Sequence, residues 1–158
     1  MRTSESMATA FDAGVCRVIL GTRACQSPES LRDFASEFGG ERLAVGIDAK
    51  DGLVAVKGWT ETTNVWATDL ARQAVDAGIR TIISTDIATD GMLQGPNFAE
   101  LEKMLAACAC QLIASGGVSC EEDVRRLNRI PGLYGVIIGK ALYDGRITGD
   151  LRRLLQPT

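Results

Sequence analysis

The sequence predicts a parallel α/β fold made of repeated strand–helix units. Short, almost entirely apolar runs alternate with amphipathic segments along the chain. Such runs are typical of strands covered on both faces of a parallel sheet. They begin about 30 residues apart, which favours a (β/α)8 barrel over a doubly wound sheet, because roughly 250 residues make eight units. The absence of GxGxxG and GxxxxGK(S/T) patterns weakens a dinucleotide-binding or P-loop interpretation.

Five apolar runs are the predicted strands, and a helix signal precedes the first run and follows each of them. The predicted order is therefore one helix and then five strand–helix units. Repeated units of this kind give a parallel sheet with right-handed crossovers. The runs are Val15–Leu20, Leu43–Ile47, Thr81–Ser84, Gln111–Ala114 and Gly135–Ile138.

Helices in the first half of the chain are marked by their starting residues and by the glycines that follow them. Met7 and Phe11 lie one helical turn apart, and Ser27 followed by Pro28 is typical of a helix start. The helices predicted here begin near Met7, at Ser27-Pro28 and at Asn64, and they end at Gly14, near Gly39-Gly40 and at Gly78.

Helices in the second half are marked mainly by capping residues. Asn97, with Glu100 three residues later, predicts one helix start. The stretch Ser119–Glu122 has the pattern of a capping box, in which the serine side chain would cap the next helix. A last short helix is predicted to carry Leu151, Leu154 and Leu155.

The amino-acid composition limits the residue types that could act in catalysis. The chain has 158 residues, which suits a single domain over residues 1–158, and it contains no histidine. Without histidine it has no Ser-His-Asp or Cys-His nucleophile and no His-ligated zinc or haem. Acid–base work therefore falls to Asp, Glu, Lys, Tyr or Cys.

Charge and hydropathy argue against nucleic-acid and membrane partners. The net charge is −3, and no block of Lys and Arg suggests a nucleic-acid groove or an anionic membrane surface. No apolar run reaches the roughly 20 residues that a membrane helix needs, and the first 30 residues hold no signal-peptide core. We therefore expect a cytoplasmic protein.

The cysteines are expected to be reduced. Their number is odd and their spacing is not CxxC, so a metal site is not expected. We predict buried or half-buried thiols at Cys16, Cys25, Cys108, Cys110 and Cys120.

Polar or glycine residues follow all five predicted strands. Ligands of parallel α/β folds bind at the carboxyl ends of the strands, so these positions form one candidate site. The positions are Gly21-Thr22, Asp48, Thr85-Asp86, Ser115-Gly116-Gly117 and Gly139-Lys140.

The last two strand ends suggest a phosphate cup. Gly116-Gly117 lets the backbone come close to a ligand just before a helix start, and Gly139-Lys140 ends the next strand. Backbone amides, including that of Lys140 in preference to its ammonium group, would hold the anion. The alternative is that both pairs are ordinary turn glycines.

Four further residues are candidates for chemistry or recognition. Asp48 ends an apolar strand, where partial burial favours the protonated form that a general acid needs; a loop or N-cap carboxylate is the alternative. Asp90 reads either as a site residue or as a turn aspartate, and Thr85 would bind substrate or orient a carboxylate. Trp59 would stack on a planar heterocycle or pack on a neighbouring helix.

Several stretches resemble the HisA family of histidine-biosynthesis isomerases, the phosphoribosylformimino-5-aminoimidazole carboxamide ribotide isomerases of the HisA/HisF superfamily. The resemblance covers essentially the whole chain, and the segment Ser84–Asn97 is its most specific part and separates the chain from the related HisF cyclase. The stretches that carry it are residues 14–22, Val45–Gly52, Lys57–Trp59, Ser84–Asn97, Ala114–Ser119 and Gly135–Gly145.

The resemblance implies a (β/α)8 TIM barrel that performs an Amadori rearrangement of an aminoaldose to an aminoketose (ProFAR to PRFAR). The substrate is a ribotide with two phosphates, and the reaction uses no metal and no organic cofactor. By resemblance, Asp48 matches the general acid that opens the ribose ring, Thr85 and Asp90 lie beside the reacting sugar, and Trp59 is a loop aromatic near the substrate. One phosphate cup matches Gly116, Gly117, Gly139 and Lys140, and part of the other matches Gly21 and Thr22.

The chain also departs from the family pattern. An Ala-Ile-Asp motif, whose Asp is the family's general base, and a Gly-Gly-Gly-Ile-Arg strand end are not present. We therefore expect a partial barrel made of strands 4–8, with two outer strands through which copies would self-associate. Whether such a chain is active alone stays open. The alternatives are a dual-substrate isomerase that also acts on phosphoribosylanthranilate and a non-catalytic, phosphosugar-binding partial barrel.

Overall fold

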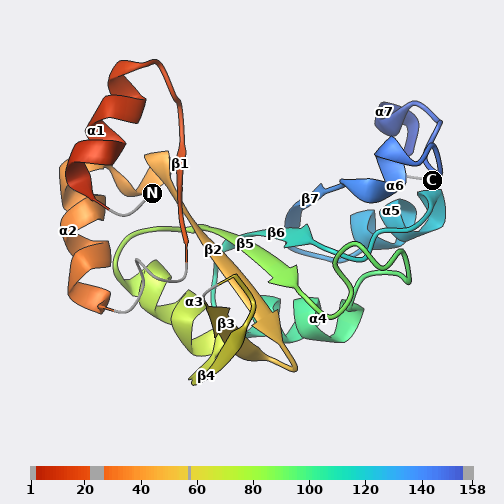
Figure 1. The fold of residues 1–158 in the computed structure, drawn as a ribbon, viewed down its shortest axis with the longest axis horizontal. Coiled ribbons are helices and arrows are strands. Elements are labelled where there is room, and N and C mark those ends of the chain that lie inside the picture. Colours follow the sequence, from red (N-terminus) through yellow and green to blue (C-terminus); the bar gives the residue numbers. More distant parts are fainter. Residues whose placement is uncertain (1–2, 22–26, 57, 155–158) are drawn as a thin grey trace.

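The computed structural model describes residues 3–21, 27–56 and 58–154. Its centre is a parallel sheet in the order β1–β2–β5–β6–β7, which confirms the five predicted strands. Within the described residues the sheet curves but does not close, as expected of a partial barrel (Figure 1). The strands are β1 (Val18–Leu20), β2 (Leu43–Lys50), β5 (Thr81–Asp86), β6 (Gln111–Ser115) and β7 (Leu133–Ile137).

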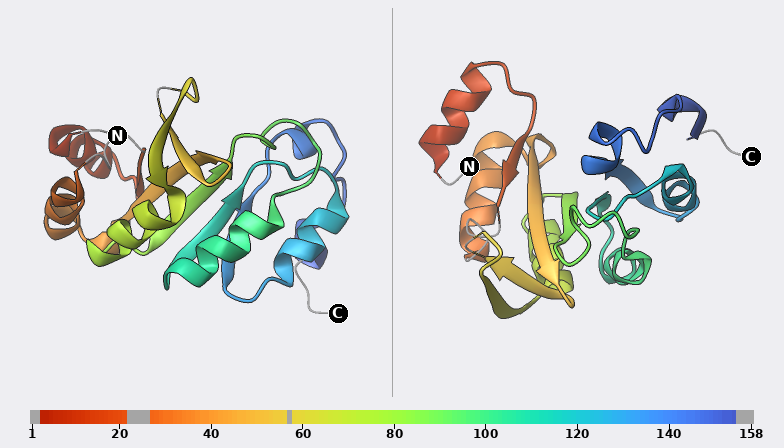
Figure 2. Two further views of the ribbon diagram at one scale, coloured as in Figure 1. Left: turned by 90° about the horizontal axis from the view of Figure 1, so that it is seen from below. Right: turned by 45° about the vertical axis from the view of Figure 1, so that its right-hand side comes forward.

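Helices lie along the outer, convex side of the sheet (Figures 1 and 2). Asn97 caps its helix as predicted, because its side chain accepts a hydrogen bond from the Glu100 amide. Among the residues that the structure describes, no helix is long and apolar enough to cross a membrane. The helices are α1 (Ser4–Asp12), α2 (Pro28–Phe38), η2 (Gly40–Arg42), α3 (Ala67–Asp76), α4 (Phe98–Ala107), α5 (Glu121–Asn128), α6 (Lys140–Tyr143) and α7 (Leu151–Leu154).

An antiparallel hairpin follows β2 and was not predicted. It consists of β3 (Leu53–Val56) and β4 (Glu61–Trp66), and β3 pairs with the end of β2. The predicted helix start at Asn64 is therefore wrong, because residues 64–66 belong to β4 and α3 begins at Ala67. Pairing with β3 outweighs the helical pattern at the start of that segment.

The predicted capping box at Ser119 is also wrong. The N-cap of α5 is Cys120, one residue later, and its side chain makes no capping bond. The hydroxyl and the amide of Ser119 instead donate to Oδ2 of Asp123, at 2.7 Å and 2.9 Å. Asp123 therefore takes the place expected for Glu122, because it reaches back to the residue before the cap.

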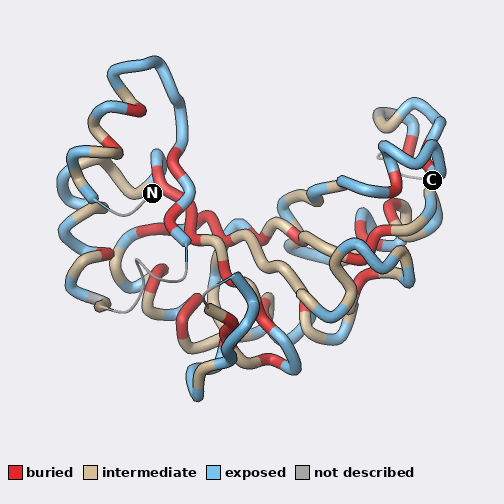
Figure 3. Tube along the Cα trace, in the orientation of Figure 1, coloured by how far each residue is buried: buried red, intermediate tan, exposed pale blue. Residues whose placement is uncertain are grey.

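The core lies between the sheet and the outer helices, and Figure 3 shows buried stretches in both strands and helices. Val45, Ile82 and Leu112 are fully buried on that side of the sheet. The opposite, concave face is less covered, since Ile19 is 51% exposed and Ile137 is 45% exposed. The carboxyl ends of the strands are therefore accessible from the concave side.

The prediction that all cysteines are at least half-buried is wrong for two of them. Cys16, in the turn before β1, and Cys120, at the start of α5, are exposed, whereas Cys108 and Cys110 are half-buried. Burial, together with the neighbouring Cys108, raises the pKa of the Cys110 thiol to about 12. The predictions for Thr22, Cys25 and Leu155, and the resemblance at Lys57, fall outside the described residues.

Candidate functional site

A polar row crosses the carboxyl end of the sheet. Asp48 of β2 is in register with Thr85 of β5, which is in register with Ser115 of β6. Register partners in neighbouring parallel strands project their side chains from the same face. Two residues earlier in each strand, on the same face of the sheet, the register partners are Gly46, Ile83 and Ile113. The polar row therefore lies next to glycine and apolar side chains on the same face of the sheet.

Asp48 and Trp59 are in direct contact. The indole Nε1–H of Trp59 donates to Oδ2 of Asp48 at 2.8 Å. Asp48 is half-buried within β2, so it is neither a loop nor an N-cap carboxylate. Trp59 lies in the turn between β3 and β4 with a φ of 73°, and 46% of its surface stays exposed. Trp59 is therefore partly accessible to a ligand, and its N–H orients the Asp48 carboxylate.

A pocket of about 230 Å³ lies at the ends of β6 and β7. It brings together five of the predicted site residues with Ser115 and Ile137. Ser115 was among the predicted strand-end positions of the candidate site but had no assigned role, and Ile137 was not predicted as a site residue. The five predicted residues in its lining are Asp90, Gly116, Gly117, Gly139 and Lys140.

The glycines of this pocket are required by close packing of two loops. Gly116 and Gly117 have φ values of 94° and 82°, a region that disfavours a side chain. A Cβ on Gly116 would lie 2.9 Å from the carbonyl oxygen of Asp86, and one on Gly117 would collide with the carbonyl of Gly95. The simple turn-glycine interpretation therefore does not describe them, since they let the loop of residues 87–96 pack against residues 116–117.

Charges around the pocket favour the backbone as the anion-binding element. The ammonium of Lys140 is 3.3 Å from Oδ2 of Asp144, in an ion pair. The first turn of α5, just after the glycine loop, is acidic, with Glu121, Glu122 and Asp123. The Lys140 ammonium is thus engaged by Asp144, and the anion-binding role of the Lys140 backbone amide stays a prediction.

Gly21 lies at the other side of the sheet. It follows β1, which pairs with β2, and two strands separate β1 from β6. Three strand spacings correspond to about 14 Å. The structure therefore groups the candidates as Asp48 with Trp59, Asp90 with the glycine pocket, and Gly21 apart from both, while Thr85 joins the first two groups through the polar row.

Comparisons with known proteins show which proteins this chain is similar to. Residues 1–148 match the family described as "Histidine biosynthesis protein". The chain is 52% identical over 147 residues to 1-(5-phosphoribosyl)-5-((5-phosphoribosylamino)methylideneamino) imidazole-4-carboxamide isomerase of Symbiobacterium thermophilum, covering 93% of this chain and 58% of the relative. The isomerases of the same name from Acidiphilium cryptum and Thermodesulfovibrio yellowstonii are 50% and 47% identical, and the alignments cover 93% and 99% of this chain.

The chain spans about three fifths of the length of these relatives, because the alignments cover 58%, 61% and 63% of them. The family match, in contrast, extends over nearly all of this chain. Its parallel α/β sheet is a partial TIM barrel of the kind that the family forms. The chain belongs to the histidine biosynthesis protein family.

Proposed function

We propose that this chain acts in the Amadori rearrangement of ProFAR to PRFAR, the step of histidine biosynthesis that isomerises an aminoaldose to an aminoketose. The observation that carries the proposal is the half-buried Asp48, in register with Thr85 and hydrogen-bonded to Trp59 at the carboxyl ends of the strands. The relatives named above are isomerases of an imidazole-carboxamide ribotide. Carboxylate chemistry also suits a chain without histidine.

In the proposed mechanism Asp48 is the general acid. It protonates the ring oxygen of the ribose, the bond from that oxygen to C1 breaks, and the amine nitrogen forms a double bond with C1. Asp90, the candidate carboxylate for the base in this chain, then takes the proton from C2 to give an enolamine, and it returns a proton to C1 to give the aminoketose. Thr85 and Asp90 hold the hydroxyl groups of the opened sugar, since hydroxyls and carboxylates are suited to that contact.

The same proposal assigns the binding residues. The backbone of Gly116, Gly117, Gly139 and Lys140 holds one phosphate, and Gly21 with Thr22 forms part of the other phosphate site. The two sites lie about 14 Å apart along the curved sheet, which keeps them separate, as a ribotide with a phosphate at each end requires. Trp59, which is partly exposed, stacks on the planar heterocycle.

Steady-state turnover of ProFAR by this chain tests the proposal. Because the family's base Asp is not among the residues of this sequence, we expect the wild type to turn over ProFAR well below the rate of a full-length relative. Asp48→Asn should lower the remaining kcat about 100-fold, since removing a general acid has an effect of that order. Asp69→Asn is the matched control, because Asp69 lies on α3 in an exposed ion pair with Arg72. Full activity in Asp48→Asn would contradict the acid assignment.

Two alternatives give different results in the same experiments. A dual-substrate isomerase would also convert phosphoribosylanthranilate, and it would complement a tryptophan auxotroph as well as a histidine auxotroph. A non-catalytic, phosphosugar-binding partial barrel would bind the substrate in calorimetry without turnover. Either result would replace the single-substrate isomerase as the function of this chain.

We further propose a single domain over residues 1–158, a cytoplasmic location and a reaction without metal or organic cofactor. Dialysis against EDTA is expected to leave turnover unchanged, and a loss that Mg²⁺ or Zn²⁺ reverses would contradict this. No nucleic-acid or membrane partner is proposed, because the net charge is −3 and no basic patch was found in the sequence. Cell fractionation tests the location.

A further inference from the structure

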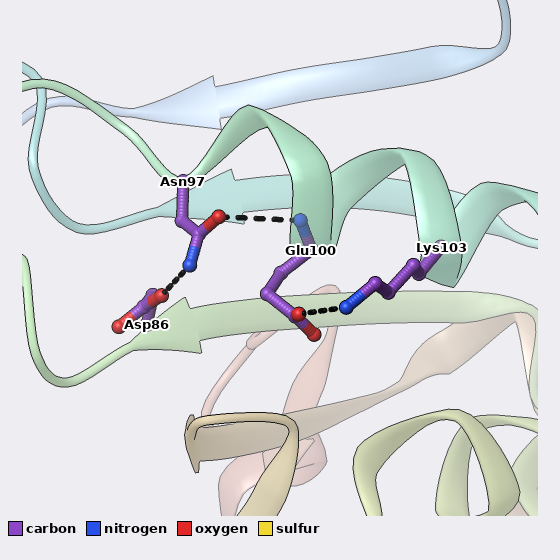
Figure 4. Close-up of polar contacts among 4 residues, drawn as sticks. All are labelled: Asp86, Asn97, Glu100 and Lys103. Atoms are coloured by element: carbon purple, nitrogen blue, oxygen red, sulfur yellow. Dashed lines mark hydrogen bonds and ion pairs between the residues drawn. The ribbon is translucent and has the colours of Figure 1, made fainter.

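The loop of residues 87–96 is tied together at its two ends by a hydrogen bond. Asp86 is the last residue of β5, and Asn97 is the N-cap of α4. The Nδ2 group of Asn97 donates to Oδ2 of Asp86 at 2.6 Å (Figure 4). The bond therefore joins the strand before the loop to the helix after it.

Both side chains are oriented by further hydrogen bonds. Oδ1 of Asp86 accepts from the amide of Ala88 at 2.9 Å. Oδ1 of Asn97 accepts from the amide of Glu100 at 3.3 Å (Figure 4). Because the carbonyl oxygen of Asn97 caps the helix, its NH2 group must face Asp86. Glu100 is itself held by an ion pair with Lys103 at 2.6 Å. Each hydrogen-bond donor in this series of contacts, from Ala88 to Lys103, therefore faces an acceptor.

This loop forms a wall of the glycine pocket. Its residue Asp90 lines the pocket, and the amide of Gly95 donates to the carbonyl of Gly117 at 2.9 Å. The amide of Asp90 donates to the backbone oxygen of Asp86 at 3.0 Å. Neither the Asp86 nor the Asn97 side chain lines the pocket, so any effect they have on it must pass through the loop.

We propose that Asp86 and Asn97 are positioning residues, which hold the loop of residues 87–96 against Gly116-Gly117 and thereby set the affinity of the pocket for phosphate. This inference rests on the proposed function, in which that pocket binds a substrate phosphate. A carboxylate acceptor makes a stronger hydrogen bond than a neutral one, and both groups are part-buried, which limits competition from water.

Exchanging the two side chains separates this role from a general loss of stability. The Asn side chain in Asp86→Asn has one acceptor oxygen where Asp86 has two, so it cannot accept from both the Asn97 NH2 and the Ala88 amide. Either the hydrogen bond to Asn97, the contact with Ala88 or the cap of α4 is therefore lost. In Asn97→Asp two carboxylates face each other and repel. The double variant Asp86→Asn/Asn97→Asp restores both contacts, because the new Asn donates to the new Asp and the latter still caps Glu100.

The experiment measures two properties of the same chain. Hydrogen–deuterium exchange of peptides covering residues 87–96 measures the order of the loop. Calorimetric titration with inorganic phosphate measures the affinity of the pocket for phosphate. We expect each single variant to exchange faster in this segment and to bind phosphate about tenfold more weakly, with Asn97→Asp the more affected. The double variant should return to within about threefold of the wild type.

Asp69→Asn, which removes a carboxylate from an exposed ion pair on α3, is the matched control and should change neither property. The positioning role is overturned if a single variant keeps wild-type exchange, if it keeps wild-type phosphate affinity, or if the double variant fails to recover. A wild-type chain that binds no phosphate would contradict the phosphate pocket of the proposed function itself. A wild type that binds phosphate without turnover would contradict only the isomerase activity.

Discussion

At the scale of single residues, the contact between Trp59 and Asp48 combines recognition with acid chemistry. Trp59→Phe removes the N–H donor at 2.8 Å from Asp48 but keeps an aromatic face, whereas Trp59→Ala removes both. If the ring stacks on the heterocycle, its loss costs about 0.5–1.5 kcal/mol. We therefore expect KM to rise about two- to tenfold in Trp59→Ala and to change less in Trp59→Phe. Equal KM values in the two variants, measured by steady-state kinetics, would rule out stacking.

Titration of Cys110 links pH to stability. Its pKa is raised to about 12 from 9.0, so the unfolded thiol ionises before the folded one. Its contribution to the free energy of unfolding is complete below pH 9 and is lost as the pH rises from 9 towards 12. Urea unfolding under reducing conditions measures this effect. Above pH 9 the free energy of unfolding should decline less steeply with pH in Cys110→Ala than in the wild type. Cys16→Ala, at an exposed position, is the control and should keep the wild-type slope.

At the scale of structural elements, the two loops of the pocket depend on each other. Gly117→Ala combines strain at a φ of 82° with a collision against the carbonyl of Gly95. Gly145→Ala is the matched control, because Gly145 has a φ of 68° and open space around its Cβ position. We expect the control to lose about 1–2 kcal/mol of unfolding free energy, and Gly117→Ala to lose more. Equal losses in chemical denaturation would mean that the loops do not pack as described.

The sequence predicted those elements whose signal is local. Apolar runs identified all five parallel strands, and Asn97 identified the start of α4. The hairpin was missed because β4 is largely exposed and therefore lacks the apolar run that marks the other strands, so that only its pairing with β3 defines it. The cap of α5 was misplaced by one residue because Ser119 bonds to Asp123 rather than to the helix backbone.

The candidate site was predictable to a similar degree. Strand-end position was enough to find Asp48, Thr85 and the glycine pairs. The bond between Trp59 and Asp48, and the packing of Gly117 against Gly95, join segments through the folded hairpin and loop. No local pattern encodes either contact, so they emerge only from the three-dimensional structure.

At the scale of the whole molecule, the sheet has apolar surface and strand edges that the described residues do not cover. The strand β7 pairs with β6 and stands at one end of the sheet. Tyr134 and Ile137 on this strand are 58% and 45% exposed. Edge strands with exposed apolar side chains favour pairing with another chain. A second copy of this chain offers the same edge, so a symmetric pair is the simplest assembly.

We therefore expect the chain to self-associate, with a dimer fraction that grows with concentration. Tyr134→Lys places a charge on the edge strand without touching the pocket residues, and it should shift the protein towards monomer because charged edges oppose pairing. Tyr143→Lys is the matched control, since Tyr143 is 89% exposed on α6, outside the sheet. Sedimentation velocity over a concentration series measures both. A monomer at every concentration, or an equal shift in the two variants, would show that the β7 edge does not mediate assembly.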